Sequence, residues 1–432
     1  AIGKLYGTIK QSDEIESAIS NISVVSGDDD DKDEVDLAEE NVSAEDAPFV
    51  KLVNLMLTQA IKEGSTDIHI EPGKTEVNIR IRVDGVLTKI MSPPITSLNG
   101  MITRIKILSK LNIAEHRLPQ DGRMKLKMGS KEIDVRVSIL PTVHGEKAVL
   151  RLLGSGDKEL NLSNLGFPDN KLSKFKKWIN QPYGMIIISG PTGSGKSTTL
   201  YAALQEIKSD NINITTVEDP VEYQIPGINQ IQVHDAIGLS FAAALRSILR
   251  QDPDVLLIGE IRDQETADIA VKFSMTGHLV FSTVHANDAP STISRLLDLG
   301  IPPFLLGSSL NLIMAQRLVR TIDSNEKIED SPTNEQLQRL GISENANQMT
   351  FYKGKPTQQN HNTGYKGRTA IHEILEVNKS IREMIFDGKS EFEIKSQAIK
   401  NGMTPLREAG IDKINEGVST VEEILRATVE DV

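Results

Sequence analysis

Two kinds of hydrophobic pattern divide the chain. Between about residues 67 and 153, apolar and polar positions alternate, as where Val77 and Ile79 flank Asn78 and precede Arg80. Such alternation predicts strands with one buried face. From about residue 166 onward, short runs that are apolar throughout, such as MIIIS and VLLI, alternate with helical segments. This second pattern indicates a mostly parallel sheet covered on both faces.

These patterns predict a division into four parts. The 432 residues are 38% hydrophobic and 25% charged, enough for two folded domains. Asp46 is the expected cap of the first helix. We expect, in chain order, an acidic and disordered linker over 1–45, an α+β domain over 46–153, an interdomain linker over 154–165, and an α/β domain with a helical C-terminal region over 166–432.

The charge is concentrated in one segment. The net charge is -12, but residues 28–46 hold eleven acids and one lysine, so the rest of the chain is nearly neutral. Together with an aromatic content of 4%, this argues against a broadly basic nucleic-acid surface. The DDDDK within the segment is either part of a natural linker or an engineered protease site, and both interpretations stay open.

The chain has no cysteine, which excludes disulfides, thiolate zinc sites and a cysteine nucleophile. Its apolar runs are far shorter than the ~18 residues that span a bilayer, and no signal peptide is visible. We therefore expect a cytoplasmic protein without a transmembrane segment. The chain starts at Ala1 rather than Met, and what preceded Ala1 stays open.

The strongest motif follows the apolar run MIIIS and precedes a helical segment. It has the spacing G-x-x-x-x-G-K-S, in which backbone N–H groups surround phosphates, the lysine reaches the terminal phosphates and the serine serves Mg²⁺. A chance glycine-rich turn is the alternative. The predicted nucleotide-binding residues here are Gly190, Pro191, Thr192, Gly193, Ser194, Gly195, Lys196, Ser197 and Thr198.

An acidic partner for this loop is Glu260, which ends the apolar run VLLIG. At the edge of a parallel sheet it could orient or deprotonate the attacking water, or hold Mg²⁺ through water together with Ser197. A helix cap or a surface acid is the structural alternative.

Two further polar clusters follow predicted strands. Glu218, Asp219 and Glu222 crowd three carboxylates into five residues, which repulsion disfavours unless a cation is near. We expect Glu218 to act in catalysis and Asp219 to contact the nucleotide. His278 and His285 bracket the strand LVFSTV, and we expect both to sense phosphate, with His285 catalytic; purely structural histidines are the alternative.

In this order, the clusters resemble the secretion-type ATPases, the hexameric motors of type II secretion and type IV pilus machines. The resemblance covers about residues 46–430. It also rests on the segments STDIHIEP (65–72), RLPQDGR (117–123), GEIRD (259–263), AQRLVR (315–320) and TGYKGR (363–368).

The resemblance implies a small α+β domain like a PAS fold, followed by a RecA-like ATPase domain. It implies ATP and Mg²⁺, a homo-hexamer, and an inner-membrane platform protein as partner. It also implies that Arg136 and Arg151 act as fingers on the phosphates and that Arg123 contacts nucleotide. The alternation of DVRV adds that Arg136 and Asp134 share one strand face.

The chain departs from the family where assembly and secretion motors carry a pair of CxxC zinc motifs. Without thiolates we expect no zinc, with helix formation and apolar packing in its place; whether the loss is natural or engineered stays open. At best the acids and His361 would form a weak, oxygen-rich site. The positions that match the cysteines are Asp323, Glu326, Thr357 and Asn360. The residues expected to be solvated are Asp323, Glu326, Asn360 and His361, and the packing residues are Leu337, Leu340 and Phe351.

The resemblance thus implies an ATP-driven hexameric motor, recruited to the cytoplasmic face of the inner membrane, for type IV pilus assembly. The alternatives are a type II secretion motor, a nucleic-acid translocase of RecA type, and a nucleotide-gated scaffold without hydrolysis. Stimulation of hydrolysis by DNA would favour the translocase, and absence of phosphate release would favour the scaffold.

Overall fold

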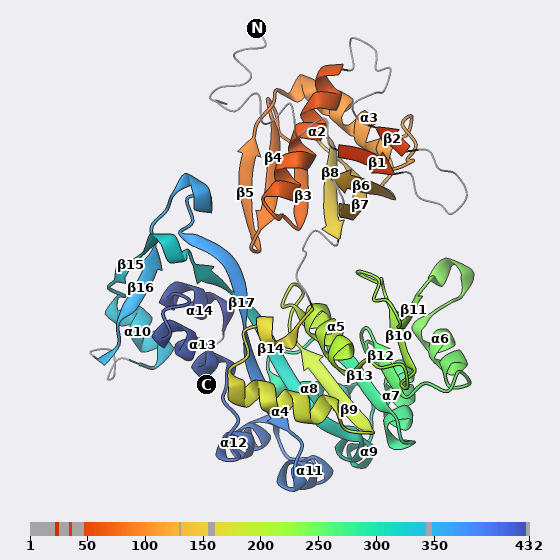
Figure 1. The fold of residues 1–432 in the computed structure, drawn as a ribbon, viewed down its shortest axis with the longest axis vertical. Helices are drawn as coiled ribbons and strands as arrows, with labels where there is room; N and C mark the ends of the chain where they lie inside the picture. The colour runs from red at the N-terminus through yellow and green to blue at the C-terminus, as the bar shows by residue number, and fades with distance from the viewer. Residues whose placement is uncertain are drawn as a thin grey trace. The chain divides into compact units, whose positions relative to one another are not determined.

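A computed structural model describes residues 22–25, 34–36, 47–128, 131–153, 160–342 and 348–428 (Figure 1). The chain divides into two units, Ala1–Asp157 and Lys158–Val432, and each is described by itself. Three predicted features lie largely or wholly outside the described residues: most of the acidic linker, the helix cap Asp46 and the first part of the interdomain linker.

The N-terminal unit is built on one antiparallel sheet with the strand order β2-β1-β6-β7-β8-β3-β4-β5. Its strands are β1 (Ile22–Val25), β2 (Glu34–Asp36), β3 (Asp67–Pro72), β4 (Val77–Val83), β5 (Val86–Met91), β6 (Gln120–Met128), β7 (Lys131–Thr142) and β8 (Gly145–Leu153). Strands β1 and β2 differ from the unbroken linker expected over 1–45, because three or four residues are too few for a period to stand out.

Helices α2 (Ala47–Lys62) and α3 (Leu98–Leu108) cover one face of this sheet. Val53 and Ile105 from the helices share a buried cluster with Ile79 and Val135 from the strands. The sheet therefore has one apolar face and one polar face, as the alternation predicted, and the α+β expectation is confirmed.

The C-terminal unit contains a seven-stranded sheet with the order β11-β10-β12-β13-β9-β14-β17, parallel except where β17 runs antiparallel to β14. Its strands are β9 (Gly184–Ser189), β10 (Ile214–Glu218), β11 (Asn229–Gln232), β12 (Val255–Ile258), β13 (Leu279–Val284), β14 (Leu310–Ile322) and β17 (Tyr365–Glu376). The predicted parallel-rich α/β fold is confirmed.

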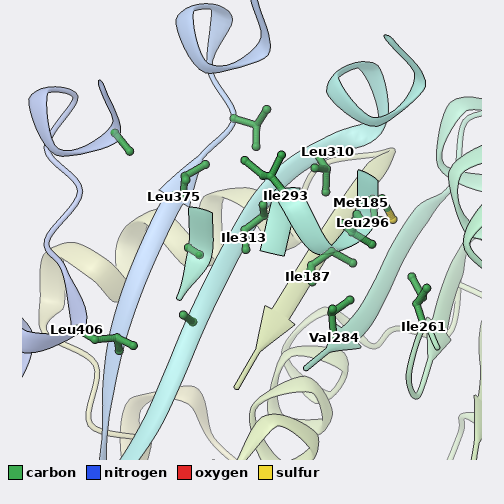
Figure 2. Close-up of a cluster of buried hydrophobic side chains, with 14 of the residues drawn as sticks. Met185, Ile187, Ile261, Val284, Ile293, Leu296, Leu310, Ile313, Leu375 and Leu406 are labelled. Atoms are coloured by element: carbon green, nitrogen blue, oxygen red, sulfur yellow. The ribbon is translucent and has the colours of Figure 1, made fainter. Parts of the chain in front are cut away.

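Successive residues of β9 enter opposite cores, which explains why the run MIII is apolar throughout. Met185 and Ile187 join one cluster, beside Ile293 (Figure 2), while Ile186 and Ile188 join the other. The helices of this unit are α4 (Asp169–Ile179), α5 (Lys196–Ile207), α6 (Phe241–Ile248), α7 (Gln264–Met275), α8 (Ala289–Asp298), α9 (Pro303–Ser309), α11 (Lys379–Phe386), α12 (Glu391–Lys400), α13 (Leu406–Asn415) and α14 (Val421–Ala427).

The segment that replaces the family's zinc region forms its own small structure between β14 and β17. Strands β15 (Lys327–Asp330) and β16 (Phe351–Gly354) pair, and α10 (Asn334–Leu340) follows β15. The apolar side chains expected to pack here, Leu337, Leu340 and Phe351, are buried in one cluster. The predicted helix and its packing are confirmed.

Two of the residues at the cysteine-matching positions are buried, so the prediction that they are solvated is wrong. Asp323 is 4% exposed and Asn360 is 1% exposed. The Asn360 amide donates to Asp323 Oδ2 (3.3 Å) and to the Lys355 carbonyl (2.9 Å), and its oxygen accepts from the N–H groups of Thr357 (2.8 Å) and Gly364 (3.1 Å). Both side chains are buried because local hydrogen bonds satisfy them.

Across the described ranges, no group of three or more histidines, acids or cysteines is arranged to hold a metal ion. Within the same ranges, no helix is both long enough and apolar enough to cross a membrane.

Candidate functional site

The phosphate loop joins β9 to α5, and the nine nucleotide-binding residues predicted there lie in the loop and in the first turn of α5. Gly190 adopts φ 151°, and a Cβ on it would lie 2.6 Å from the Gln316 carbonyl oxygen, so the backbone needs glycine at this point. The Lys196 ammonium donates to the carbonyls of Gly190 (2.8 Å) and Pro191 (3.0 Å). It therefore lies at the mouth of the loop, within reach of phosphate oxygens.

The ammonium of Lys196 is half-hidden from solvent, and this burial lowers its pKa. The carboxylates of Glu260 and Glu222 oppose the shift, while Arg317 adds to it. A partly desolvated cation between two acids interacts strongly with a polyphosphate.

Strand β14 supports the loop through Gln316, which is 2% exposed. Its amide donates to the Ser194 carbonyl (2.7 Å), and its oxygen accepts from the Thr199 hydroxyl (2.8 Å). The neighbouring Arg317 donates to the carbonyl of Asn287 (2.6 Å), in the loop after β13. Sequence reasoning placed Gln316 and Arg317 in a family segment but gave them no role; the signal that could have found Gln316 is its place directly after the apolar run LIMA (312–315).

The acidic residues at the end of β10 and after it lie in two different environments. Glu218 is buried, and its carboxylate accepts from the hydroxyls of Tyr201 and Thr216 and from the Gln230 amide. Burial and the Glu218 charge together raise the pKa of Tyr201 far above its ordinary value, so the phenol stays a donor. Glu218 thus anchors the cluster from inside the domain.

Glu222 faces the phosphate loop instead. Its carboxylate accepts from the Ser197 hydroxyl at 3.0 Å. Sequence reasoning included Glu222 in the acidic cluster but not among the site residues, and it paired Ser197 with Glu260. The signal that could have found Glu222 is its place at the end of the cluster, beyond the strand.

Glu260 follows β12 and lies between two bases. One oxygen is 2.9 Å from Arg262 Nη2, and the other is 3.3 Å from His285 Nε2. Arg262 also approaches Asp219 at 3.8 Å, and the hydrogen bond that Arg262 donates to Glu260 raises the pKa of the Arg262 guanidinium. The structure therefore brings together Glu260, His285 and Asp219, as predicted, through an arginine that the prediction did not include.

A pocket of about 460 Å³ opens beside the loop. Its lining residues come from the phosphate loop, from the loop after β13 and from α8, and they are Gly190, Pro191, Thr192, His285, Ala286, Asn287, Ser291 and Arg295.

The structure does not bring His278 to this site, which corrects the grouping of the two histidines. His278 precedes β13, and its carbonyl accepts from the N–H of Gly184 at the start of β9. The phosphate loop follows the other end of β9, about 20 Å away for a six-residue strand. Two residues that bracket one strand must lie at opposite edges of the sheet. The His278 ring packs on Phe273 and bonds Thr276.

The three predicted arginines of the N-terminal unit form a row across the polar face of its sheet. Arg123 pairs in register with Arg136, and Arg136 with Arg151, which in turn lies opposite Asp67. Asp67 Oδ1 accepts from Arg151 Nε at 2.9 Å. Like charges directly opposite each other destabilise a sheet, so this row favours an anionic ligand.

Comparison with known proteins identifies the family. The family model for type II/IV secretion system proteins matches residues 42–426. The type IV pilus assembly ATPase PilB of Myxococcus xanthus is 49% identical over 392 residues, which cover 90% of this chain and 69% of that protein. The type II secretion system ATPase E of Vibrio cholerae is 46% identical over 388 residues, which cover 90% and 77%.

Among solved structures, the pilus retraction motor PilT with bound ADP is similar, with a TM-score of 0.58 and 25% identity over 86% of this chain and 95% of that one. The fold, the phosphate loop and the relatives agree with the resemblance found in the sequence, which is confirmed. The chain belongs to the type II/IV secretion system protein family and is an ATP-binding, ATP-hydrolysing enzyme of that family.

Proposed function

We propose that this ATPase is the motor that powers type IV pilus assembly. The observation that carries the proposal is the 49% identity with a pilus assembly ATPase over 90% of the chain, against 46% for a secretion ATPase. The family further supports a homo-hexamer that works in the cytoplasm, where ATP is made available, on an inner-membrane platform protein. Type II secretion is the second candidate, because the same comparison includes both classes.

Deleting the gene in its native host tests this proposal. We expect surface pili, counted by electron microscopy, to disappear while the amount of secreted hydrolase in the medium stays unchanged. Complementation with the full chain should restore pili, and complementation with the Glu260→Gln variant should not. Loss of secretion with intact pili would assign the chain to type II secretion instead.

In the proposed reaction, Glu260 aligns the attacking water. The water oxygen forms a bond to the γ-phosphorus, the bond from that phosphorus to the β-γ bridging oxygen breaks, and ADP leaves with its electron pair. The water proton passes to Glu260 or to the phosphate. Arg262 and His285 contact different oxygens of Glu260 and restrain the carboxylate, which has lone pairs left to accept from water.

The residues around Ser197 fit a magnesium ion bound with ATP. Mg²⁺ favours oxygen ligands, and protein sites usually supply one or two carboxylates beside the phosphates. The Ser197 hydroxyl and the Glu222 carboxylate, 3.0 Å apart, would hold the ion, with Glu260 contributing through water. Bound there, Mg²⁺ would neutralise charge on the phosphates. Within this arrangement Glu222 orients the Ser197 hydroxyl.

We further propose that Arg136 and Arg151 act on the phosphates, with Arg123 as a third contact. The γ-phosphoryl group spreads negative charge over its oxygens during transfer, and guanidinium groups stabilise that charge. The side chain of Arg151 is 62% exposed although it bonds Asp67, so one side of the guanidinium remains accessible. The row thus offers three cations within two strand spacings.

Three other predicted residues keep proposed roles. Asp219 would position Arg262 for Glu260, which the 3.8 Å approach supports. Glu218 would act through Tyr201, whose hydroxyl accepts from the Glu222 N–H at 3.2 Å. His278 lies at the far edge of the sheet, so any contact of His278 with phosphate would have to involve nucleotide on another subunit.

A further inference from the structure

The pocket beside the phosphate loop contains a cation that the reaction described above does not use. Arg295 lies on α8 and lines the pocket together with Pro191 and Thr192 of the phosphate loop. Within the described part of the chain, the guanidinium of Arg295 forms no hydrogen bond and no ion pair. An exposed arginine that lines a pocket and has all its side-chain donors available points to an anionic ligand.

Arg295 projects from a helix that is held firmly in place. Ser291 and Arg295 are one turn apart on α8, so both face the pocket. The Asp288 carboxylate caps the helix through the Ser291 N–H (2.8 Å), and the buried Glu373 accepts from the Ala289 N–H (2.6 Å). The guanidinium is therefore attached to a fixed wall rather than to a loop.

The charges around the pocket also favour an anion. Two carboxylates contact lining residues: Glu260 is shared by Arg262 and His285, and Asp288 is occupied by its own helix and by Lys395 at 3.4 Å. Gly190, Pro191 and Thr192 of the phosphate loop also line the pocket. Thr192, which carries a hydroxyl, is exposed.

We propose that this pocket is a phosphate site, in which Arg295 and the Thr192 hydroxyl bind the phosphate that hydrolysis separates from ADP. His285 contacts Glu260 and lines the same pocket, so it forms the boundary between the cleavage point and the site. After cleavage, phosphate would leave through this pocket, along the side of it that Arg295 of α8 lines. The inference rests on ATP hydrolysis at the loop and is independent of which machine the motor drives.

Inorganic phosphate is the probe that tests the site. With the full chain, we expect Arg295→Gln to raise the inhibition constant of phosphate in steady-state hydrolysis about tenfold or more, since a charge-assisted contact is lost. Arg295→Lys should recover part of this loss. The control is Arg250→Gln, which removes an exposed arginine outside the pocket and should change nothing. ADP affinity should stay unchanged in all three variants.

A second experiment distinguishes binding of the γ-phosphate of intact ATP from binding of the phosphate released by hydrolysis. If Arg295 already contacts the γ-phosphate, Arg295→Gln will weaken binding of a non-hydrolysable ATP analogue relative to ADP; if it receives only the released ion, analogue affinity will not change. Should Arg295→Gln be inactive, calorimetric titration of phosphate into the ADP-loaded variant gives the same answer. Unchanged phosphate inhibition together with unchanged analogue binding would overturn the proposal, as would an equal loss of ADP affinity.

Discussion

The two sheets of this protein position their functional side chains in opposite ways. In the ATPase unit, both faces of the sheet are buried, so polar residues gather where strands end, as with the phosphate loop after β9 and Glu260 after β12. In the N-terminal unit, one face is open, and Arg136 and Arg151 lie within strands on that face. In the covered sheet, loops at the strand ends position these side chains. In the open sheet, the register of the strands positions them.

This difference decides how much disruption a substitution causes. A loop residue such as Glu260 is held by a few side chains, here Arg262 and His285. A residue within a strand is held by the backbone ladder on both sides. Removing a guanidinium from the open face should therefore leave the sheet intact, so activity and stability separate cleanly there.

The comparison is tested most strongly at Glu260. Glu260→Gln keeps the shape of the side chain but removes its basicity, so we expect the rate of phosphate release to fall by about two to four orders of magnitude while ATP binding is retained. Lys196→Ala should weaken nucleotide binding itself. A Glu260→Gln variant with nearly normal turnover would show that water alignment is not performed at the end of β12.

Arg136→Ala and Arg151→Ala test the open sheet. Each should lower turnover by about tenfold to a hundredfold, because the proposed contact with the phosphates is lost but neighbouring arginines remain. Melting temperatures should stay within a few degrees of wild type. Arg80→Ala serves as the control and should retain activity, because Arg80 lies on the same face but two residues along β4 from the register of the row, where it pairs with Glu71. Equal losses of stability and activity would contradict the separation.

Asn360→Ala tests whether hydrogen bonds hold the segment between β14 and β17. The substitution leaves the N–H groups of Thr357 and Gly364 without their partner, so we expect the free energy of unfolding to fall by roughly 2 kcal/mol. Gln359→Ala at the exposed neighbouring position should have little effect. Zinc-selective chelators should leave hydrolysis unchanged; inactivation by them would disprove a metal-free segment.

The covered sheet also buries titratable groups, which gives a smaller effect of pH. Burial raises the pKa of Glu373 from 4.5 to about 7. Between these values the folded chain holds more protons than the unfolded one, so its free energy of unfolding falls as pH rises, by up to roughly 1 kcal/mol per pH unit. Chemical denaturation of wild type and of Glu373→Gln at several pH values measures the free energy of unfolding of each. The free energy of wild type minus that of the variant should decrease as pH rises.

The buried His372 shifts in the opposite direction, with its pKa lowered by burial to about 3. It is present in both proteins, so its contribution cancels in the difference. Glu383→Gln, at an exposed glutamate, should show no such trend. A difference that does not change between pH 4.5 and 7 would exclude the Glu373 carboxylate as its source.

Local signals were enough to predict much of the fold and the site. The phosphate loop, Glu260 and the alternating strands each depend on spacing within a few residues, so sequence reasoning found them. Gln316 was not recognised because its partner Ser194 is 122 residues away in the chain. The burial of Asn360 was not predicted, because its partner Asp323 is 37 residues away in the chain, although its other three partners lie within five residues of it.

His278 shows the opposite failure. The sequence placed two histidines close together, and proximity in the chain was taken as proximity in space. A strand is a rigid spacer, however, so residues before and after it belong to different edges of the sheet. Direction along the strand therefore carries information that distance along the chain does not.

The row formed by Arg123, Arg136 and Arg151 has a consequence for ionic strength. Neighbouring strands are about 5 Å apart, well within the Debye length of about 10 Å at 0.1 M salt, so these cations repel each other in dilute buffer. Dissolved anions and the polyphosphate of ATP relieve the same repulsion, and they do so in competition. The N-terminal unit should thus gain thermal stability as salt is added, while the contribution to nucleotide affinity that we propose for its arginines should decline.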